Sequence, residues 1–324
     1  MTQYKDKNIL VTGGTGMIGI PLVKLLLSKG ANVRIASLDN PDRAHPDAEY
    51  HKIDLREFSN CMKVCKDINY VFHLAGVKGA PGIVIKKAAT ILVSFLRLNT
   101  NMMEAAFQNN VDRYLFTSTI GVYGPAEVFY EDKVWDSFPS KNDWYGGWGK
   151  RMGELQAEAY KVEHGWDRVT IVRPANVYGP WDNFDPLNSM VIPSLIRGAV
   201  DGEDPLVIWG DGSPVRDFIH TNDVAEGMLI AIEKGLGQNI NLASGKGTSI
   251  KELAEIIVKN LDKKPKIVWD KSKPSGDKKR VMDITNAKKI GFKPKISLEE
   301  GIKDTMQWYG KNKQMINSYH NVLR

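Results

Sequence analysis

Three glycines near the start of the chain are spaced for binding a dinucleotide. They stand in the segment Gly13-Gly14-Thr15-Gly16-Met17-Ile18-Gly19, between an apolar run and a helical pattern. Gly13 permits a tight turn, Gly16 lets a pyrophosphate approach the backbone, and Gly19 lets the helix pack closely on the strand. The N-terminus of that helix offers free N–H groups to the phosphates. The segment therefore predicts a dinucleotide-binding turn, with Thr15, Met17 and Ile18 also at the ligand.

The residues after the second expected strand decide between NAD and NADP. An acidic residue at the end of that strand would bind the adenosine ribose hydroxyls, but Ser37 stands there and Asp39 follows two residues later. Asp39 would favour NAD, whereas Ser37 together with Arg43 would accept a 2′-phosphate and favour NADP. Both alternatives stay open. Asp54 follows a third expected strand, where its carboxylate could accept a hydrogen bond from an adenine amino group.

Strands and helices alternate along the first half of the chain and would position this turn. Buried strands are expected at residues 8–12, 33–36, 70–74, 114–118 and 169–172, and helices at 18–28 and 98–109. Such alternation indicates a parallel sheet covered on both faces. The expected fold is α/β, a Rossmann-type doubly wound parallel sheet with a smaller C-terminal α/β lobe for substrate.

The pattern changes after Pro174, where prolines and tryptophans become frequent and the segments become short. Amphipathic helices are expected at 250–260 and 298–309. We therefore assign residues 1–179 to a dinucleotide-binding domain, to which 217–241 return. Residues 180–216 and 242–324 form the expected substrate-binding lobe.

Composition narrows the class of protein. The 324 residues are 42% hydrophobic and 25% charged, which excludes a disordered or disulfide-stapled chain. No apolar run approaches ~18 residues, the N-terminal residues are polar, and Cys61 and Cys65 are spaced for one helix face rather than for a metal or disulfide. We expect a cytoplasmic protein without membrane contact.

The formal charge of +6 comes from 44 basic and 38 acidic residues, with the basic excess late in the chain. No basic helix with interleaved aromatic residues is present, so a nucleic-acid partner is not expected. A solvated lysine surface and a positive field that attracts an anionic small molecule remain as alternatives.

Several motifs carry a resemblance to a known family. They are the glycine turn, His73-Leu74-Ala75-Gly76, Thr117-Ser118-Thr119-Ile120-Gly121-Val122-Tyr123-Gly124, Arg173-Pro174-Ala175-Asn176-Val177-Tyr178-Gly179-Pro180, Trp209-Gly210-Asp211-Gly212, Arg216-Asp217-Phe218-Ile219-His220, and Lys273-Pro274-Ser275-Gly276 before Asp283. Together they resemble the extended short-chain dehydrogenase/reductase enzymes of nucleotide sugars, the NAD-dependent epimerase/dehydratase family, and within it the GDP-fucose synthase branch. The resemblance implies NAD or NADP as cofactor, a nucleotide-sugar substrate and a homodimer formed by the helix that ends near Asn109 and the helix that carries Lys150. It extends the expected cofactor site to Leu55, Leu74, Ala75, Gly76, Asn99, Thr117, Lys150, Pro174, Asn176 and Val177.

The resemblance also implies the catalytic groups. Thr119 matches the hydroxyl that binds the reacting oxygen, and Lys150 matches the lysine that lowers the pKa of a catalytic tyrosine. The family spacing would place that tyrosine at 146, where the chain has Gly146, and Tyr145 precedes it. On a regular helix a step of five residues turns about 500°, which leaves Tyr145 and Lys150 ~140° apart. A π-bulge or a helix that starts after residue 146 would restore the alignment.

Other departures from the family narrow the reaction. Ile120 and Gly121 stand where dehydratases carry an acidic pair, and Gly121 and Met190 stand where GDP-fucose synthases carry the cysteine and histidine that epimerise C3 and C5. Neither glycine nor methionine can exchange a proton. Chemistry at one carbon remains: C4 epimerisation, 4-keto reduction or alcohol oxidation. We expect hydride transfer at C4, in an epimerase or a 4-keto reductase of a GDP-sugar.

Substrate contacts follow from the resemblance as well. They fall on Thr119, Asn176, Asn188, Ser189, Val191, Trp209, Arg216 and Asp283. A guanidinium at Arg216 can grip a diphosphate, with an ion pair to Asp217 or Asp211 as the alternative, and Asp283 could instead cap the following helix. His73 and His220 are expected to pack or cap rather than act as bases, and no metal site is expected. The rival hypothesis is a regulatory protein that keeps the cofactor fold without turnover.

Overall fold

A computed structural model describes residues 3–77, 86–273 and 275–314. Its central sheet has seven strands, all parallel, in the order β3-β2-β1-β4-β5-β6-β10. The strands are β1 (Asn8–Thr12), β2 (Asn32–Ser37), β3 (Glu49–Lys52), β4 (Tyr70–His73), β5 (Arg113–Thr117), β6 (Val169–Pro174) and β10 (Asn239–Leu242). This order confirms the expected Rossmann-type doubly wound sheet.

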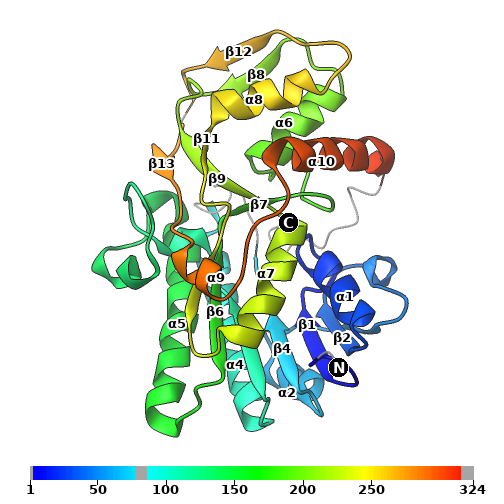
Figure 1. Ribbon diagram of the computed structural model, residues 1–324, viewed down its shortest axis with the longest axis vertical. Helices are drawn as coiled ribbons and strands as arrows, with labels where there is room; N and C mark the ends of the chain where they lie inside the picture. The colour runs from blue at the N-terminus through cyan, green and yellow to red at the C-terminus, as the bar shows by residue number, and fades with distance from the viewer. Residues whose placement is uncertain (1–2, 78–85, 274, 315–324) are drawn as a thin grey trace.

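Helices cover both faces of the sheet (Figure 1). α1 (Gly19–Ser28) and α7 (Thr221–Lys234) pack on one face, and α2 (Phe58–Cys65), α4 (Ala88–Gln108) and α5 (Trp144–His164) pack on the other. Side chains of a strand alternate between faces, so Ile9 and Val11 enter the first core and Leu10 enters the second. Both layers are apolar, which explains why the strands read as continuous hydrophobic runs.

Most expected elements form, with one large change of boundary. α4 begins at Ala88 rather than at Leu98. The additional turns carry Ile91 and Phe95, whose spacing continues the buried face of the helix. Cys61 and Cys65 both lie on the buried side of α2, as expected, and burial raises the pKa of each thiol to about 12.

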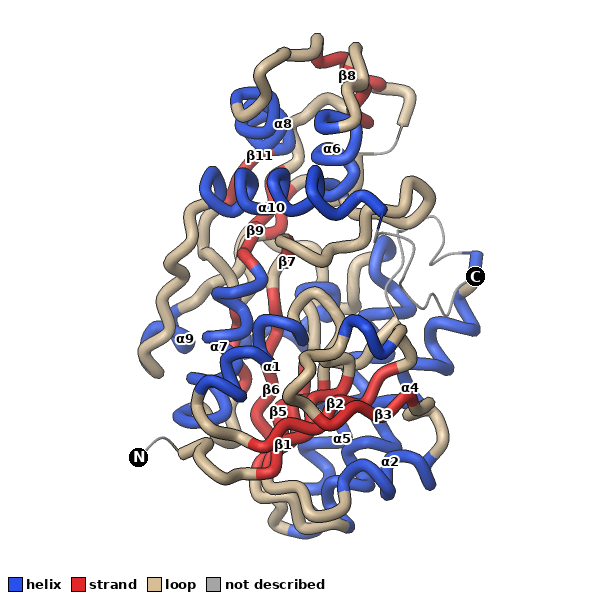
Figure 2. Tube along the Cα trace, turned by 90° about the vertical axis from the view of Figure 1, so that its right-hand side faces the viewer, coloured by secondary structure: helices blue, strands red, loops and turns tan. Residues whose placement is uncertain are grey.

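A smaller lobe stands at the carboxyl ends of the strands (Figures 1 and 2). It contains β7 (Asn176–Tyr178), α6 (Val191–Val200), β8 (Leu206–Trp209), β9 (Val215–His220), β11 (Gly247–Ser249), α8 (Ile250–Lys259), β12 (Ile267–Asp270), β13 (Lys279–Arg280) and α10 (Leu298–Asn312). β9 pairs with β7, β11 and β13, while β8 pairs with β12. Because β6 leads directly into β7, the lobe is fixed beside the edge of the sheet where ligands bind.

Two segments of the second half pack on the central sheet. β10 pairs with β6 and α7 covers β10, β6 and β5. Met282, Ile284 and Phe292, which flank α9 (Thr285–Lys289), belong to the same apolar core as α7. Among the described residues, no helix is both long and apolar enough to cross a lipid bilayer.

Candidate active site

The glycine turn between β1 and α1 has the geometry that a pyrophosphate needs. Gly13 has φ +68°, and a Cβ there would lie 3.2 Å from the backbone N of Ala75 after β4. A Cβ at Gly19 would lie only 2.3 Å from the carbonyl oxygen of Gly13, so no side chain fits where the helix meets the turn. A Cβ at Gly16 would meet only that same oxygen, at 3.2 Å. The backbone is therefore open toward a ligand, at the point where strand order reverses between β1 and β4.

The residues expected at the adenosine ribose are hydrogen-bonded to this turn. The Thr15 hydroxyl donates to Asp39 Oδ2 at 2.7 Å and lies 2.7 Å from Ser37 Oγ. The Tyr50 hydroxyl donates to the Asp39 carbonyl at 2.5 Å, which fixes the backbone after β2. Arg43 is buried, and its guanidinium lies over the Trp181 ring at 5.2 Å from the ring centre. An acid and a hydroxyl thus stand side by side at the end of β2.

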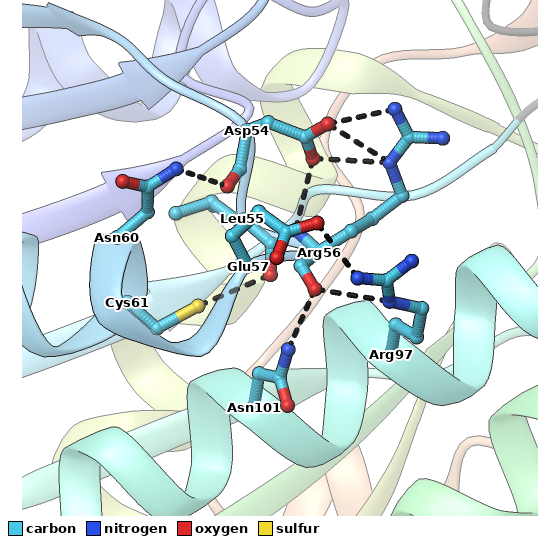
Figure 3. A network of polar contacts seen from close by, with 8 residues as sticks. All are labelled: Asp54, Leu55, Arg56, Glu57, Asn60, Cys61, Arg97 and Asn101. Carbon is cyan, nitrogen blue, oxygen red and sulfur yellow. Dashed lines mark hydrogen bonds and ion pairs between the residues drawn. The ribbon is translucent and has the colours of Figure 1, made fainter.

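Asp54 follows β3, and its carboxylate is engaged by a neighbour. Arg56 donates to both oxygens through Nε and Nη2, with the shortest contact at 2.7 Å, and these hydrogen bonds hold the pKa of Asp54 below its ordinary value. Figure 3 shows the surrounding network, in which Cys61 Sγ donates to the Leu55 carbonyl and Arg97 and Asn101 donate to the Arg56 carbonyl. The loop after β3 is therefore rigid, and the role of Asp54 toward an adenine stays a prediction.

A buried chain of hydrogen bonds links the glycine turn to α5. The Thr12 hydroxyl accepts from the amides of Leu74 and Ala75, so its proton goes to His73 Nδ1, 2.9 Å away. The other ring nitrogen of His73 lies 3.3 Å from Asn99 Oδ1, and Asn99 Nδ2 donates to the Gly149 carbonyl. This pattern requires a neutral His73 with its proton on Nε2. The ring is fully buried with a partner at each nitrogen, as expected of a packing residue, and burial and the nearby Lys150 charge lower the pKa of His73 to about 3.

Lys150, on α5 directly after Gly149, is buried. Its Nζ lies 5.0 Å from the centre of the Phe116 ring and 5.2 Å from that of Phe95. A Cβ at Gly76 would lie 4.0 Å from the same Nζ, so the ammonium faces the loop after β4. Burial lowers the pKa of Lys150 to about 7, although Glu154 acts in the opposite direction. The group can therefore hold or release a proton near neutral pH.

The helix around Tyr145 is regular, which corrects one expectation. α5 is α-helical without interruption from Trp144, so neither a π-bulge nor a late start realigns Tyr145 with Lys150. The Tyr145 ring packs with Ile91 and Phe95. Gly146 takes the position one turn before Lys150, and a Cβ there would meet only Phe95, at 3.8 Å. Tyr145 and Lys150 share Phe95 as a neighbour, and the catalytic role of Tyr145 stays a prediction.

Buried charged side chains of α5 and β6 fix the loop after β5, which carries Thr119. The sequence analysis assigned them no role. Ser118 Oγ donates to Glu154 at 2.5 Å, and Arg173 pairs with both carboxylate oxygens of Glu154, at 3.0 and 2.7 Å. Arg151 donates twice to the Val122 carbonyl, at 2.9 and 2.6 Å. The Thr119 hydroxyl accepts from the Gly121 amide at 3.2 Å. One helix, α5, thus supplies Lys150 and also fixes the loop that faces it.

The remaining expected cofactor residues stand at the carboxyl ends of adjacent strands. Leu74, Ala75 and Gly76 follow β4, Thr117 ends β5, Pro174 ends β6, and Asn176 and Val177 lie in β7. Asn99 lies on α4 beside them, and Leu55 follows β3. Because parallel strands end at one edge, the fold brings these residues to the same side of the sheet as the glycine turn.

Most of the expected substrate residues lie in the lobe, whereas Thr119 follows β5 and Asp283 precedes α9, which packs on the central sheet. Asn176 Nδ2 donates to the Asp217 carbonyl, Asn188 is buried, and Val191 begins α6 after Ser189 and Met190. Trp209 ends β8 and is 64% exposed, with Lys273 Nζ 5.8 Å from its ring centre. Pro274 of the late motif lies outside the described residues.

Two of the alternatives for these residues are decided by contacts. Arg216 Nη1 donates to the carbonyls of Val215 and Asp277, whereas the Asp217 carboxylate accepts from Ser244 and Gly245. An ion pair between Arg216 and Asp217 is therefore wrong. The Asp283 carboxylate accepts from the Thr285 amide and hydroxyl at the start of α9, although Ile284 rather than Asp283 is the N-cap of that helix, and its role toward a substrate stays a prediction. His220 caps α7 by accepting from the Asn222 amide, as expected.

Sequence reasoning also missed an ion pair between the residue that precedes α5 and strand β13. Asp143 precedes α5 and Arg280 belongs to β13, and their side chains meet at 2.6 Å. Asp143 stands where a helix cap is common, and Arg280 lies three residues before the singled-out Asp283. Neither position carried a signal that distinguishes it from ordinary surface charge.

Comparisons with known proteins cover nearly the whole chain. Residues 9–243 match the model of the "NAD dependent epimerase/dehydratase family". GDP-L-fucose synthase 1 of Arabidopsis thaliana is 30% identical over 95% of this chain and 94% of its own, and dTDP-4-dehydro-6-deoxy-D-allose reductase of Streptomyces bikiniensis is 30% identical over 95% and 97%. The crystal structure of UDP-glucose 4-epimerase from Thermotoga maritima with UDP-glucose has a TM-score of 0.83 and 28% identity, covering 94% of this chain and 99% of that one.

Proposed function

Since this chain belongs to the NAD-dependent epimerase/dehydratase family, we propose that it transfers a hydride at C4 of a nucleotide sugar, as an NAD(P)-dependent epimerase or 4-keto reductase. A GDP-linked sugar is the substrate class we favour, since GDP-L-fucose synthases are among its relatives over nearly the full length. The observation that carries the proposal is the open glycine turn, with Lys150 buried at the same edge of the sheet and facing the loop that packs on that turn.

The residues that would hold the cofactor are those of the turn, with Ser37 and Asp39 at the adenosine and Gly76 and Lys150 at the nicotinamide end. When bound, NAD or NADP supplies the acceptor or donor of the hydride. The backbone amides that begin α1 bind the phosphates. The Lys150 ammonium binds ribose hydroxyls and adds positive charge to a site that the rings of Phe95 and Phe116 keep dry.

The proton that accompanies the hydride needs a group of its own. We assign the Thr119 hydroxyl to the reacting oxygen, because the loop after β5 places it at the site edge and Ser118, Glu154 and Arg173 hold that loop. Tyr145 is the proposed proton carrier. A neighbouring ammonium favours the phenolate of such a tyrosine, and both Tyr145 and Lys150 lie against Phe95.

A homodimer is part of the proposal. Leu155 and Val162 lie on one exposed side of α5, since a step of seven residues keeps nearly the same helix face, and they are 45% and 80% exposed. Half-buried Trp148 precedes them on the same face. Val93 of the adjacent α4 is 50% exposed. An apolar stripe of this kind on paired helices is typical of a contact between copies. We place the enzyme in the cytoplasm, where its two buried cysteines stay reduced.

A cofactor-binding protein without turnover is the second candidate. The observation that favours it is Gly146, which leaves the Lys150 side of α5 without a phenol. Purified protein distinguishes the two when it is denatured and the released cofactor is identified, and when hydride exchange is then measured on GDP-, UDP- and dTDP-sugars. Bound oxidised cofactor with exchange indicates an epimerase, and a need for added reduced cofactor indicates a reductase. Tight cofactor binding without exchange on any sugar contradicts the enzymatic proposal.

A further inference from the structure

A cavity of about 210 Å³ lies between the second half of α5 and the edge strand β10. Its lining includes Val169 and Asn239, the first residues of β6 and β10, and Trp166, Asp167 and Gly237, which precede those strands. The candidate active site stands at the opposite, carboxyl ends of the strands. The cavity is therefore a separate site, and none of its lining residues is among those assigned to the cofactor or the substrate.

The walls of the cavity combine two indole rings with apolar surface from the sheet. Trp135, in the short helix η3 (Glu131–Asp136), is 49% exposed, whereas Trp166 is buried. Val169 and Ile171 add buried apolar side chains from β6. A cavity of about 150 Å³ can hold a benzene ring. This cavity therefore has room for one six-membered ring with substituents.

The polar part of the lining consists mainly of carboxylates. Glu158 is exposed and makes no hydrogen bond or ion pair within the described part of the chain. Asp167 pairs with Lys161 at 3.0 Å, and both side chains stay about half exposed. Glu154 is buried and pairs with Arg173. Because carboxylate oxygens only accept hydrogen bonds, a ligand that fits here must bring donors.

The charges around the cavity are balanced, which favours a neutral ligand. The three carboxylates are matched by three cations, namely Lys161 in the lining, Arg173 beside Glu154, and Arg151, whose guanidinium lies 5.3 Å from the centre of the Trp135 ring. A phosphate would face the carboxylates, and an amine would face the cations. Hydroxyl groups donate to a carboxylate and accept from an ammonium without adding charge. A neutral ring with several hydroxyl groups therefore fits best.

We propose that this cavity binds a single neutral sugar ring. Hydroxyl groups donate to the oxygens of Glu158 and Asp167, and the C–H face of the ring packs on Trp135. A nucleotide sugar does not fit, because its diphosphate would lie against the carboxylates. Glu154 lines the cavity and also accepts from Ser118, so the sugar lies one side chain away from the loop that carries Thr119. Binding there does not require the proposed hydride transfer.

Saturation-transfer NMR and calorimetry on the full chain test this site. The probes are D-glucose, D-mannose and L-fucose, with an excess of GDP and NADP to block the candidate active site. We expect saturable binding of at least one sugar, and a loss of about tenfold or more in Trp135→Ala and in Glu158→Gln. Methyl α-D-mannoside distinguishes the two sources of such a ring. Binding equal to that of mannose indicates the end of a glycan, and weaker binding indicates a free sugar.

Matched variants keep the test specific to the cavity. Phe138→Ala changes an exposed aromatic residue of the same segment as Trp135, and Glu163→Gln changes an exposed carboxylate of α5, so neither should alter the affinity. Asn239→Tyr adds a ring at the exposed start of β10 and should abolish binding, with an unchanged circular dichroism spectrum.

Three outcomes contradict the proposal. They are no saturable binding of any sugar, sugar binding that the variants in the cavity leave unchanged, and tighter binding of choline or inorganic phosphate than of every sugar. None of these results bears on the hydride transfer, which is measured separately with nucleotide sugars.

Discussion

Gly146 lies one helical turn before Lys150 and on the same side of α5. A residue four positions earlier is only ~40° around the helix, whereas Tyr145 is ~140° away. The space beside Gly146 is open apart from Phe95. A phenol at 146 would therefore approach the ammonium without crowding, and the native chain has its phenol one residue too early.

Moving the tyrosine from position 145 to position 146 tests whether its phenol carries the proton of the reaction. Tyr145→Phe should reduce hydride turnover by orders of magnitude if Tyr145 carries the proton. Gly146→Tyr in that background should restore part of the rate, since the new side chain shares the Lys150 face. Steady-state rates at saturating cofactor report both effects, with Tyr130→Phe, an exposed tyrosine, as control. An unaltered rate in Tyr145→Phe removes Tyr145 from the mechanism.

Lys150 predicts a particular dependence of stability on pH. Burial lowers its pKa from 10.5 to about 7, so between these values the unfolded chain binds a proton that the folded chain does not. Stability contributed by this group therefore rises with pH, by up to about 1.4 kcal/mol per pH unit. Lys150→Met removes the difference. We expect the free energy of unfolding, measured with denaturant from pH 6 to 9.5, to rise in the wild type relative to the variant above about pH 7. If both free energies change with pH in the same way, the pKa of Lys150 is not lowered by folding.

The position of Asp39 leads to a prediction about the preference for NAD over NADP. Its carboxylate is fixed by the Thr15 hydroxyl just after β2, and we expect it to lie near the adenosine ribose of a bound cofactor. Removing one negative charge should relieve repulsion of that phosphate. We expect Asp39→Asn to raise the affinity for NADP relative to NAD, measured by quenching of tryptophan fluorescence, while exposed Asp47→Asn leaves the ratio as it was. A ratio that moves toward NAD would show that the 2′-phosphate binds elsewhere.

The apolar stripe on α5 predicts the oligomeric state. Leu155→Glu with Val162→Glu places two charges on the expected contact between copies, where unpaired charges are costly to bury. Sedimentation should show a dimer for the wild type and a monomer for the variant, with an unchanged circular dichroism spectrum. Glu163→Gln, which alters a neighbouring exposed charge, should stay dimeric. A monomeric wild type contradicts the proposed interface.

The sequence was sufficient for the parts of the fold that depend on local pattern. The glycine turn between β1 and α1, the parallel strands and the cap that His220 forms on α7 follow from residue type and short spacing. The early start of α4 at Ala88 was missed, although Ile91 and Phe95 continue the spacing of its buried face.

Short sequence patterns could not predict the contacts between segments that are far apart in the chain. Asp143 and Arg280 are separated by more than a hundred residues, and only the placement of the lobe on the sheet brings them to 2.6 Å. Glu154 and Arg173 likewise resemble ordinary charges until the fold buries both. The geometry of α5 at Tyr145 needed coordinates, since glycine-rich sequence permits a regular helix and a distorted one alike.

The relay of Thr12, His73 and Asn99 limits how this scaffold can be re-engineered. It ties the glycine turn to the carbonyl of Gly149, beside the lysine, and the Thr12 hydroxyl and the His73 ring use every donor and acceptor that they have. Replacing the turn with that of another nucleotide-binding protein would therefore disturb the helix that carries Lys150, unless Thr12, His73 and Asn99 are kept together.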